Sequence, residues 1–160
     1  MSKIVTIAAL VGVLLGATSA GAQSYYQKEA SLYAELFGTG GELSVHFEKL
    51  ISGNLTARTG VGLMGVSFRK GYTIPFGMSI LLGKDRNFIE LGGGGTWIDF
   101  DDNGTEDVLF DLKEDQLVGH AIAGYRFIGD YGLTYRLAFT PAFTKDGFKP
   151  MGGAAFGKSF

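Results

Sequence analysis

The sequence predicts an all-β chain that forms an eight-stranded antiparallel up-and-down transmembrane β-barrel. Polar and apolar residues alternate with period two through eight successive runs, which is the pattern of a strand with two different faces. The runs reach the ~9–11 residues of a tilted membrane strand, whereas a typical soluble strand has ~5–6. The composition, with 26 Gly, 13% aromatic residues and 3 Pro, favours a strongly curved sheet.

The eight runs are 31–38, 42–50, 55–66, 72–82, 87–98, 116–127, 132–143 and 148–160. The fourth run alternates most clearly, and one of its faces carries Tyr72, Ile74, Phe76, Met78, Ile80 and Leu82. Six successive apolar residues at period two leave little room for a helix there.

The orientation of the two faces follows from the residues on the polar face. That face is rich in Gly, Ser, Thr and Ala as well as charge, and the narrow interior of an eight-stranded barrel needs small side chains. The apolar face is then directed towards lipid. Aromatic residues near the run ends resemble membrane-interface girdles: Tyr72, Trp97, Tyr125, Phe127, Phe143, Phe148 and Phe160. A soluble periplasmic lipid-binding barrel, with the apolar face inside, is the alternative.

The first 22 residues predict a cleaved signal peptide. Lys3 precedes an apolar run at 4–16, and small residues occupy Ala20 and Ala22. The run is too short to span ~30 Å of hydrocarbon as a helix. Removal of residues 1–22 from the 160 leaves a domain of 138, residues 23–160. The absence of Cys excludes disulfides and thiolate chemistry.

The lengths of the connections predict the orientation in the membrane. With both termini in the periplasm, the short turns at 52–54, 83–86 and 129–130 are periplasmic. The connections near Gly40, Arg69 and Lys145 and the long segment 99–115 are then outside. Long connections on the outer side are typical of outer-membrane barrels.

The chain ends in a run that closes on Phe160, with Phe156 four residues earlier and Lys158 where an aromatic residue is often found. This ending resembles the C-terminal sorting signal of bacterial outer-membrane proteins. With the signal peptide and the eight runs, the mature chain is similar to the small OmpA- and OmpX-like barrels of Gram-negative cell envelopes. The resemblance implies an outer-membrane location and insertion by the barrel assembly machinery, and it names no ligand.

Eight ionisable residues lie on the predicted inner face, and we expect them to form a buried ion-pair network, because charges removed from water must be paired. They are Glu35, His46, Glu48, Arg58, Glu90, His120, Arg126 and Arg136. An enzyme is the alternative, since small barrels of this kind include lipid A deacylases and acyltransferases. Ser44, His46 and His120 are the weak candidates for catalysis. The His-x-Ser order of the deacylases is absent, and the ~7 Å strand spacing between Ser44 and His46 predicts no direct contact between them.

Eight of the 16 acidic residues lie in the segment 99–115, opposed only by Lys113. Within it, Asp99, Asp101 and Asn103 followed by Gly104 reproduce the first half of a calcium loop, although Phe110 replaces the closing Glu. A weak Ca²⁺ site and an ordinary solvated turn both remain open, and no other cofactor is expected. The acidity disfavours nucleic acid as a partner. We expect a structural or surface-interaction role, with outer-membrane lipids as partners and 99–115 as the contact region for an extracellular ligand.

Overall fold

The computed structural model describes residues 28–64, 71–100, 117–145 and 147–160. The predicted signal peptide therefore lies outside the described residues. The described residues form ten strands: β1 (Ala30–Gly38), β2 (Gly41–Ser52), β3 (Leu55–Leu63), β4 (Gly71–Lys84), β5 (Asn87–Phe100), β6 (Leu117–Ile128), β7 (Leu133–Phe139), β8 (Ala142–Thr144), β9 (Gly147–Lys149) and β10 (Gly152–Ser159). In the described part of the chain, no helix has the length and apolar character needed to cross a membrane.

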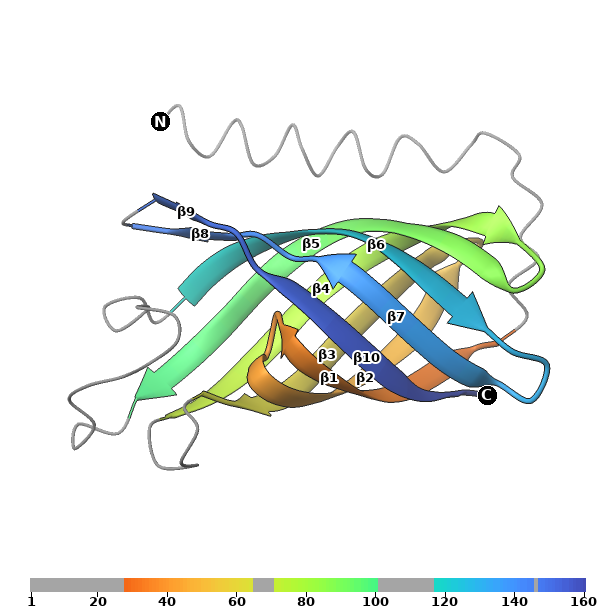
Figure 1. The fold of residues 1–160 in the computed structure, drawn as a ribbon, viewed down its shortest axis with the longest axis horizontal. Helices are drawn as coiled ribbons and strands as arrows, with labels where there is room; N and C mark the ends of the chain where they lie inside the picture. Colours follow the sequence, from red (N-terminus) through yellow and green to blue (C-terminus); the bar gives the residue numbers. More distant parts are fainter. Residues whose placement is uncertain (1–27, 65–70, 101–116, 146) are drawn as a thin grey trace.

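The strands close into an antiparallel barrel with eight wall positions and up-and-down connectivity (Figure 1). Consecutive strands pair from β1 to β7, and β10 pairs with both β1 and β7, which closes the ring. The short strand β8 pairs with β6 and β9 beyond the end of β7. Residues Ala30 and Phe160 are hydrogen-bonded to each other at one end of the barrel, which we call the terminal end. The opposite end, where β5 stops and β6 starts, is the distal end (Figure 1).

Two of the predicted runs are each divided into two strands. The seventh run is broken between β7 and β8 at Pro141, and the eighth between β9 and β10 at Pro150. Proline has no N–H to give to a strand ladder, so the regular pairing stops at both positions. The backbone N–H of Thr140 still donates to the carbonyl of Met151, and this bond holds the two breaks side by side. In the predicted third run, β3 ends at Leu63 and Met64 is outside the strand, whereas residues 65 and 66 lie outside the described residues.

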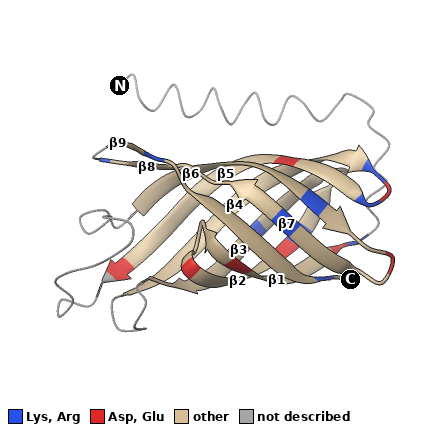
Figure 2. Cartoon of the chain, in the orientation of Figure 1, with Lys and Arg blue, Asp and Glu red and all other residues tan. Residues whose placement is uncertain are grey.

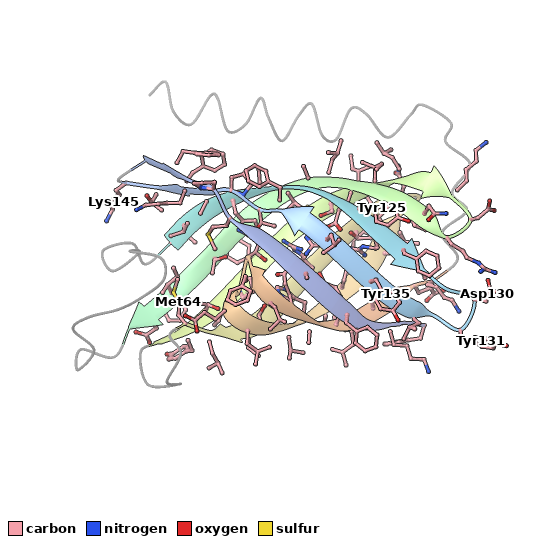
Figure 3. The ribbon with its side chains drawn as sticks, viewed as in Figure 1. Met64, Tyr125, Asp130, Tyr131, Tyr135 and Lys145 are labelled. Atoms are coloured by element: carbon pink, nitrogen blue, oxygen red, sulfur yellow. The ribbon has the colours of Figure 1, made fainter. Side chains whose placement is uncertain are left out.

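The predicted orientation of the two faces is confirmed. Twenty-seven large apolar or aromatic side chains are exposed among the described residues, and twelve apolar residues are buried. On β4, Phe76 and Met78 are 44% and 46% exposed, whereas Ser79 is 2% exposed. Figure 3 shows the side chains projecting from the outside of the wall along most of the barrel. The exterior of the barrel is thus rich in exposed apolar side chains.

The interior is less uniformly polar than the alternation predicts, because apolar residues close both ends. At the distal end, a cluster of buried side chains consists of Met64, Ile98, Val118, Ala142 and Met151. At the terminal end, Leu81, Phe88 and Ile128 are buried together, with Leu50 packed against them. We call these groups the distal seal and the terminal seal, and the charged residues lie between them.

The close approach of β4 and β5 depends on glycine. A Cβ atom built on Gly94 would lie 2.0 Å from the Phe76 carbonyl oxygen, whereas one on Gly119, on the neighbouring strand β6, would meet nothing within 4 Å. We expect Gly94→Ala to destabilise the barrel by about 1–3 kcal/mol, as overpacked sites do, and Gly119→Ala to be tolerated. The midpoint of the heat-induced gel-mobility shift compares the two variants, and equal midpoints would contradict the close approach.

Candidate functional site in the barrel interior

The structure places all eight ionisable residues of the inner face inside the barrel, and each is at most 7% exposed. They come from six of the eight wall positions, so the interior brings together residues that are distant in the sequence. Figure 2 shows charged positions within the wall as well as at the turns. Three carboxylates, of Glu35, Glu48 and Glu90, face three guanidinium groups, of Arg58, Arg126 and Arg136.

Glu90 on β5 is the centre of this network. Its Oε2 atom accepts from Arg126 Nη2 at 2.8 Å and from Arg136 Nε at 2.8 Å, and its Oε1 atom accepts from the Ser79 hydroxyl at 3.0 Å. Glu90 is 0% exposed. A charge buried to this degree must have partners of opposite sign and filled hydrogen-bonding positions, and Glu90 has both.

The two arginines extend the network across the lumen. Arg126 on β6 forms a two-pronged contact with Glu48 on β2, in which Nη2 donates to Oε2 at 2.9 Å and Nη1 donates to Oε1. Arg136 on β7 donates through Nη1 to Glu35 on β1. The guanidinium of Arg126 also lies 5.9 Å from the centre of the Tyr33 ring. Each arginine thus joins Glu90 to an acid on the opposite wall.

Arg58 on β3 is paired more loosely than the other two arginines. Its Nη1 atom is 4.0 Å from Glu90 Oε1, and its Nη2 atom donates to the Thr39 hydroxyl at 3.2 Å. The same Nη2 atom is 3.5 Å from His120 Nε2. Because an arginine only donates, His120 Nε2 is the acceptor there, and the ring is then neutral with its proton on Nδ1. The His120 Nδ1 atom lies 3.4 Å from the Thr96 hydroxyl oxygen, which can accept this proton.

Ser44, His46 and Glu35 lie in direct contact. The Ser44 hydroxyl is 2.8 Å from His46 Nε2, which is 3.1 Å from Glu35 Oε2. The expectation that Ser44 and His46 are too far apart was wrong, because the strand spacing separates the Cα atoms and the imidazole ring reaches back along the strand. A serine–histidine–acid relay uses both ring nitrogens. Here both contacts use Nε2, and the three residues are at most 1% exposed.

The turn between β1 and β2 folds into the distal mouth. Thr39 and Gly40 are buried, and side chains from other strands bind the backbone of this turn. Thr96 donates to the Thr39 carbonyl at 2.7 Å, and Thr73 donates to the Gly40 carbonyl at 2.6 Å. The Thr39 N–H donates to Glu35 Oε2 at 3.2 Å. The sequence predicted a tight turn here but not that the turn folds inward. Glycines 38, 40, 41 and 62 are the sequence feature that could have indicated close packing around this turn.

The remaining predicted sites lie apart from the interior. Asp99 is at the distal end of β5 and accepts a hydrogen bond from the Tyr72 hydroxyl, whereas Asp101 and Asn103 lie outside the described residues. In the described ranges, no group of three His, Cys, Asp or Glu residues is arranged to hold a metal ion. Phe156 and Phe160 are exposed on the last strand and at its end, 54% and 59% respectively.

Comparison with known proteins adds no family to this description. No protein-family model, no curated protein and no solved structure matches the chain.

We expect Glu90→Gln to destabilise the barrel by about 3–5 kcal/mol, because the change leaves Arg126 and Arg136 without a shared carboxylate in a buried place. The matched control is Asp130→Asn, which removes the ion pair with Arg86 at the terminal end. Those two side chains are 63% and 50% exposed, so its loss costs about 0–1 kcal/mol. Unfolding by denaturant measures both, and a Glu90→Gln variant as stable as the control would contradict the central position of Glu90.

Proposed function

We propose that this chain is an outer-membrane β-barrel with a structural and surface-interaction role, and that its interior is a sealed scaffold. The observation that carries the proposal is the apolar exterior. Leu91, Val45 and Leu137 on three separate strands are 46%, 47% and 64% exposed. Such side chains are stable at the surface of a closed barrel when hydrocarbon surrounds them.

Aromatic pairs at both ends of the exterior support this location. At the distal end, Tyr72 packs edge-on against Trp97 with ring centres 6.1 Å apart, and Phe143 packs against Phe148 at 5.8 Å. At the terminal end, where Figure 3 labels Tyr135, the centre of the Tyr135 ring is 6.3 Å from that of Phe127 and 5.3 Å from that of Phe156. Aromatic girdles of this kind lie at the two interfaces of membrane barrels.

The distance between the two aromatic levels fits a membrane. Phe127 pairs with Asn87, and Trp97 lies ten residues further along the same strand (97 minus 87). Ten residues rise about 33 Å along a strand, which is about 25 Å across the bilayer at a tilt of ~40°. The apolar band of outer-membrane barrels has that height.

The interior supports a scaffold rather than a pore or an enzyme. The ion-pair network fills the middle of the lumen, and the distal and terminal seals lie above and below it. The Ser44–His46–Glu35 contact is enclosed between these seals, out of reach of a lipid substrate. The contact between Ser44 and His46 is therefore in favour of the lipid A-modifying alternative, but the buried position of the Ser44 hydroxyl is against it. A soluble lipid-binding barrel requires an apolar lumen, and the charged side chains occupy that space.

The partners in this proposal follow from the orientation. With the terminal end in the periplasm, the acidic segment 99–115 joins β5 to β6 on the outer side. Its eight carboxylates make it a contact region for a cationic surface or ligand. Outer-membrane lipids cover the exterior, and the barrel assembly machinery inserts the chain, as in the OmpA- and OmpX-like barrels that the sequence resembles.

The proposal predicts that a charge in the middle of the apolar exterior is costly. We expect Leu91→Lys to lower the stability of the inserted barrel by about 2–4 kcal/mol and to reduce its amount in outer membranes. Leu82→Lys is the matched control, because Leu82 has a similar exposure of 44% but lies near the terminal end, where the cost falls to about 0–1 kcal/mol.

Cell fractionation and the gel-mobility shift on boiling measure both variants. The proposal fails if the protein is soluble in the periplasm and both lysine variants fold as well as the unchanged chain, since an exposed Leu→Lys change in water is nearly neutral.

A further inference from the structure

A small cavity lies under the distal seal, on the outer side of the ion-pair network. Its volume is about 20 Å³. The apolar side of its lining belongs to the distal seal, and the polar side consists of Thr39, Thr73, Thr96, Thr140 and His120. A buried site needs about 10–15 Å³ to hold one water molecule, so a cavity of this volume has room for one water molecule.

Thr140 supplies the second observation. This residue is 1% exposed, and among the residues that the structure describes its hydroxyl has no hydrogen-bond partner. Thr140 lies in the break between β7 and β8, where its backbone N–H donates to the Met151 carbonyl at 2.8 Å. A buried hydroxyl without a hydrogen-bond partner is destabilising, so a partner in the cavity that this hydroxyl lines would stabilise the fold.

The other threonines of the lining offer hydrogen-bond acceptors, whereas Thr140 offers a donor. Thr73 and Thr96 already donate their hydroxyl protons to the backbone of the β1–β2 turn. Their oxygens therefore have only acceptor positions left, and the Thr96 oxygen also faces His120 Nδ1. Thr140 can donate. A ligand in this cavity must accept from one hydroxyl and donate to others, which is the hydrogen-bonding pattern of water.

The lining argues against an ion. No carboxylate lines the cavity to bind a cation. His120 is neutral and its Nδ1 proton faces Thr96, so it offers an anion no positive charge. We propose that the cavity binds one ordered water molecule, which connects Thr140 at the β7–β8 break to the threonine hydroxyls of β4 and β5. The water thereby links the β7–β8 break to strands β4 and β5, whose threonines bind the β1–β2 turn.

The test is a high-resolution crystal structure of the purified protein, grown with bromide in place of chloride, together with Thr140→Val and Thr140→Ser. Valine keeps the shape of threonine and removes the hydroxyl, whereas serine keeps the hydroxyl. We expect a single spherical density within hydrogen-bonding distance of the Thr140 hydroxyl, without a bromide anomalous signal. The density should persist in Thr140→Ser and be lost in Thr140→Val.

Three results would overturn the proposal. The first is no density in the unchanged protein, and the second is a bromide signal, which would mean that the ligand is an anion. The third is density that persists in Thr140→Val, which would mean that Thr140 does not hold it. The proposal concerns the interior alone, so its failure would leave the outer-membrane location standing, and a soluble location would not remove the cavity.

Discussion

Pairing of buried charge is the constraint on which this barrel depends. Glu90 accepts from Arg126 and Arg136, and these two arginines reach Glu48 and Glu35 on the opposite wall. Removing any one partner leaves a charge in a place without water, so the strands must close in the register that brings all five together. The network therefore stabilises one closed arrangement of the wall by joining strands far apart in the sequence.

The network also explains why the exterior is apolar. Eight strands enclose an interior just wide enough for side chains, and here charged groups and threonines occupy it. Because these groups fill the interior, the large apolar side chains lie on the outside of the wall, except for those in the two seals. Such a chain is stable where hydrocarbon replaces water around it. In the proposed membrane location, the aromatic pairs at the two ends would lie at the limits of the hydrocarbon.

Much of the fold could be predicted from the sequence, because period-two alternation specifies both the strands and the face of each residue. The pairing inside could not, since which Glu meets which Arg depends on the stagger of strands around the ring. The inward turn at Thr39 is held by hydroxyls from β4 and β5, and no local pattern encodes those partners. Ile98 and Val118 close the distal end because the inward face continues past the charged region.

The two proline breaks illustrate the same limit. Pro141 and Pro150 are visible in the sequence as breakers of strand pairing, but their position side by side, joined by the bond from Thr140 to Met151, is a property of the closed wall. The expectation that Ser44 and His46 make no contact was wrong, because it considered the spacing of residues along the strand and not the reach of the imidazole ring. Sequence patterns thus specify where the backbone goes, and three-dimensional packing determines which side-chain atoms touch.

The central claim is that lipid surrounds the exterior, and the only Trp of the chain tests it directly. Trp97 is 38% exposed on the outer face of β5 in the distal aromatic level. In vesicles containing brominated lipids, we expect quenching of its fluorescence, stronger with bromine near the headgroup than at the end of the acyl chain. Fluorescence unchanged by bromine at any depth, in protein that remains folded, would contradict the account.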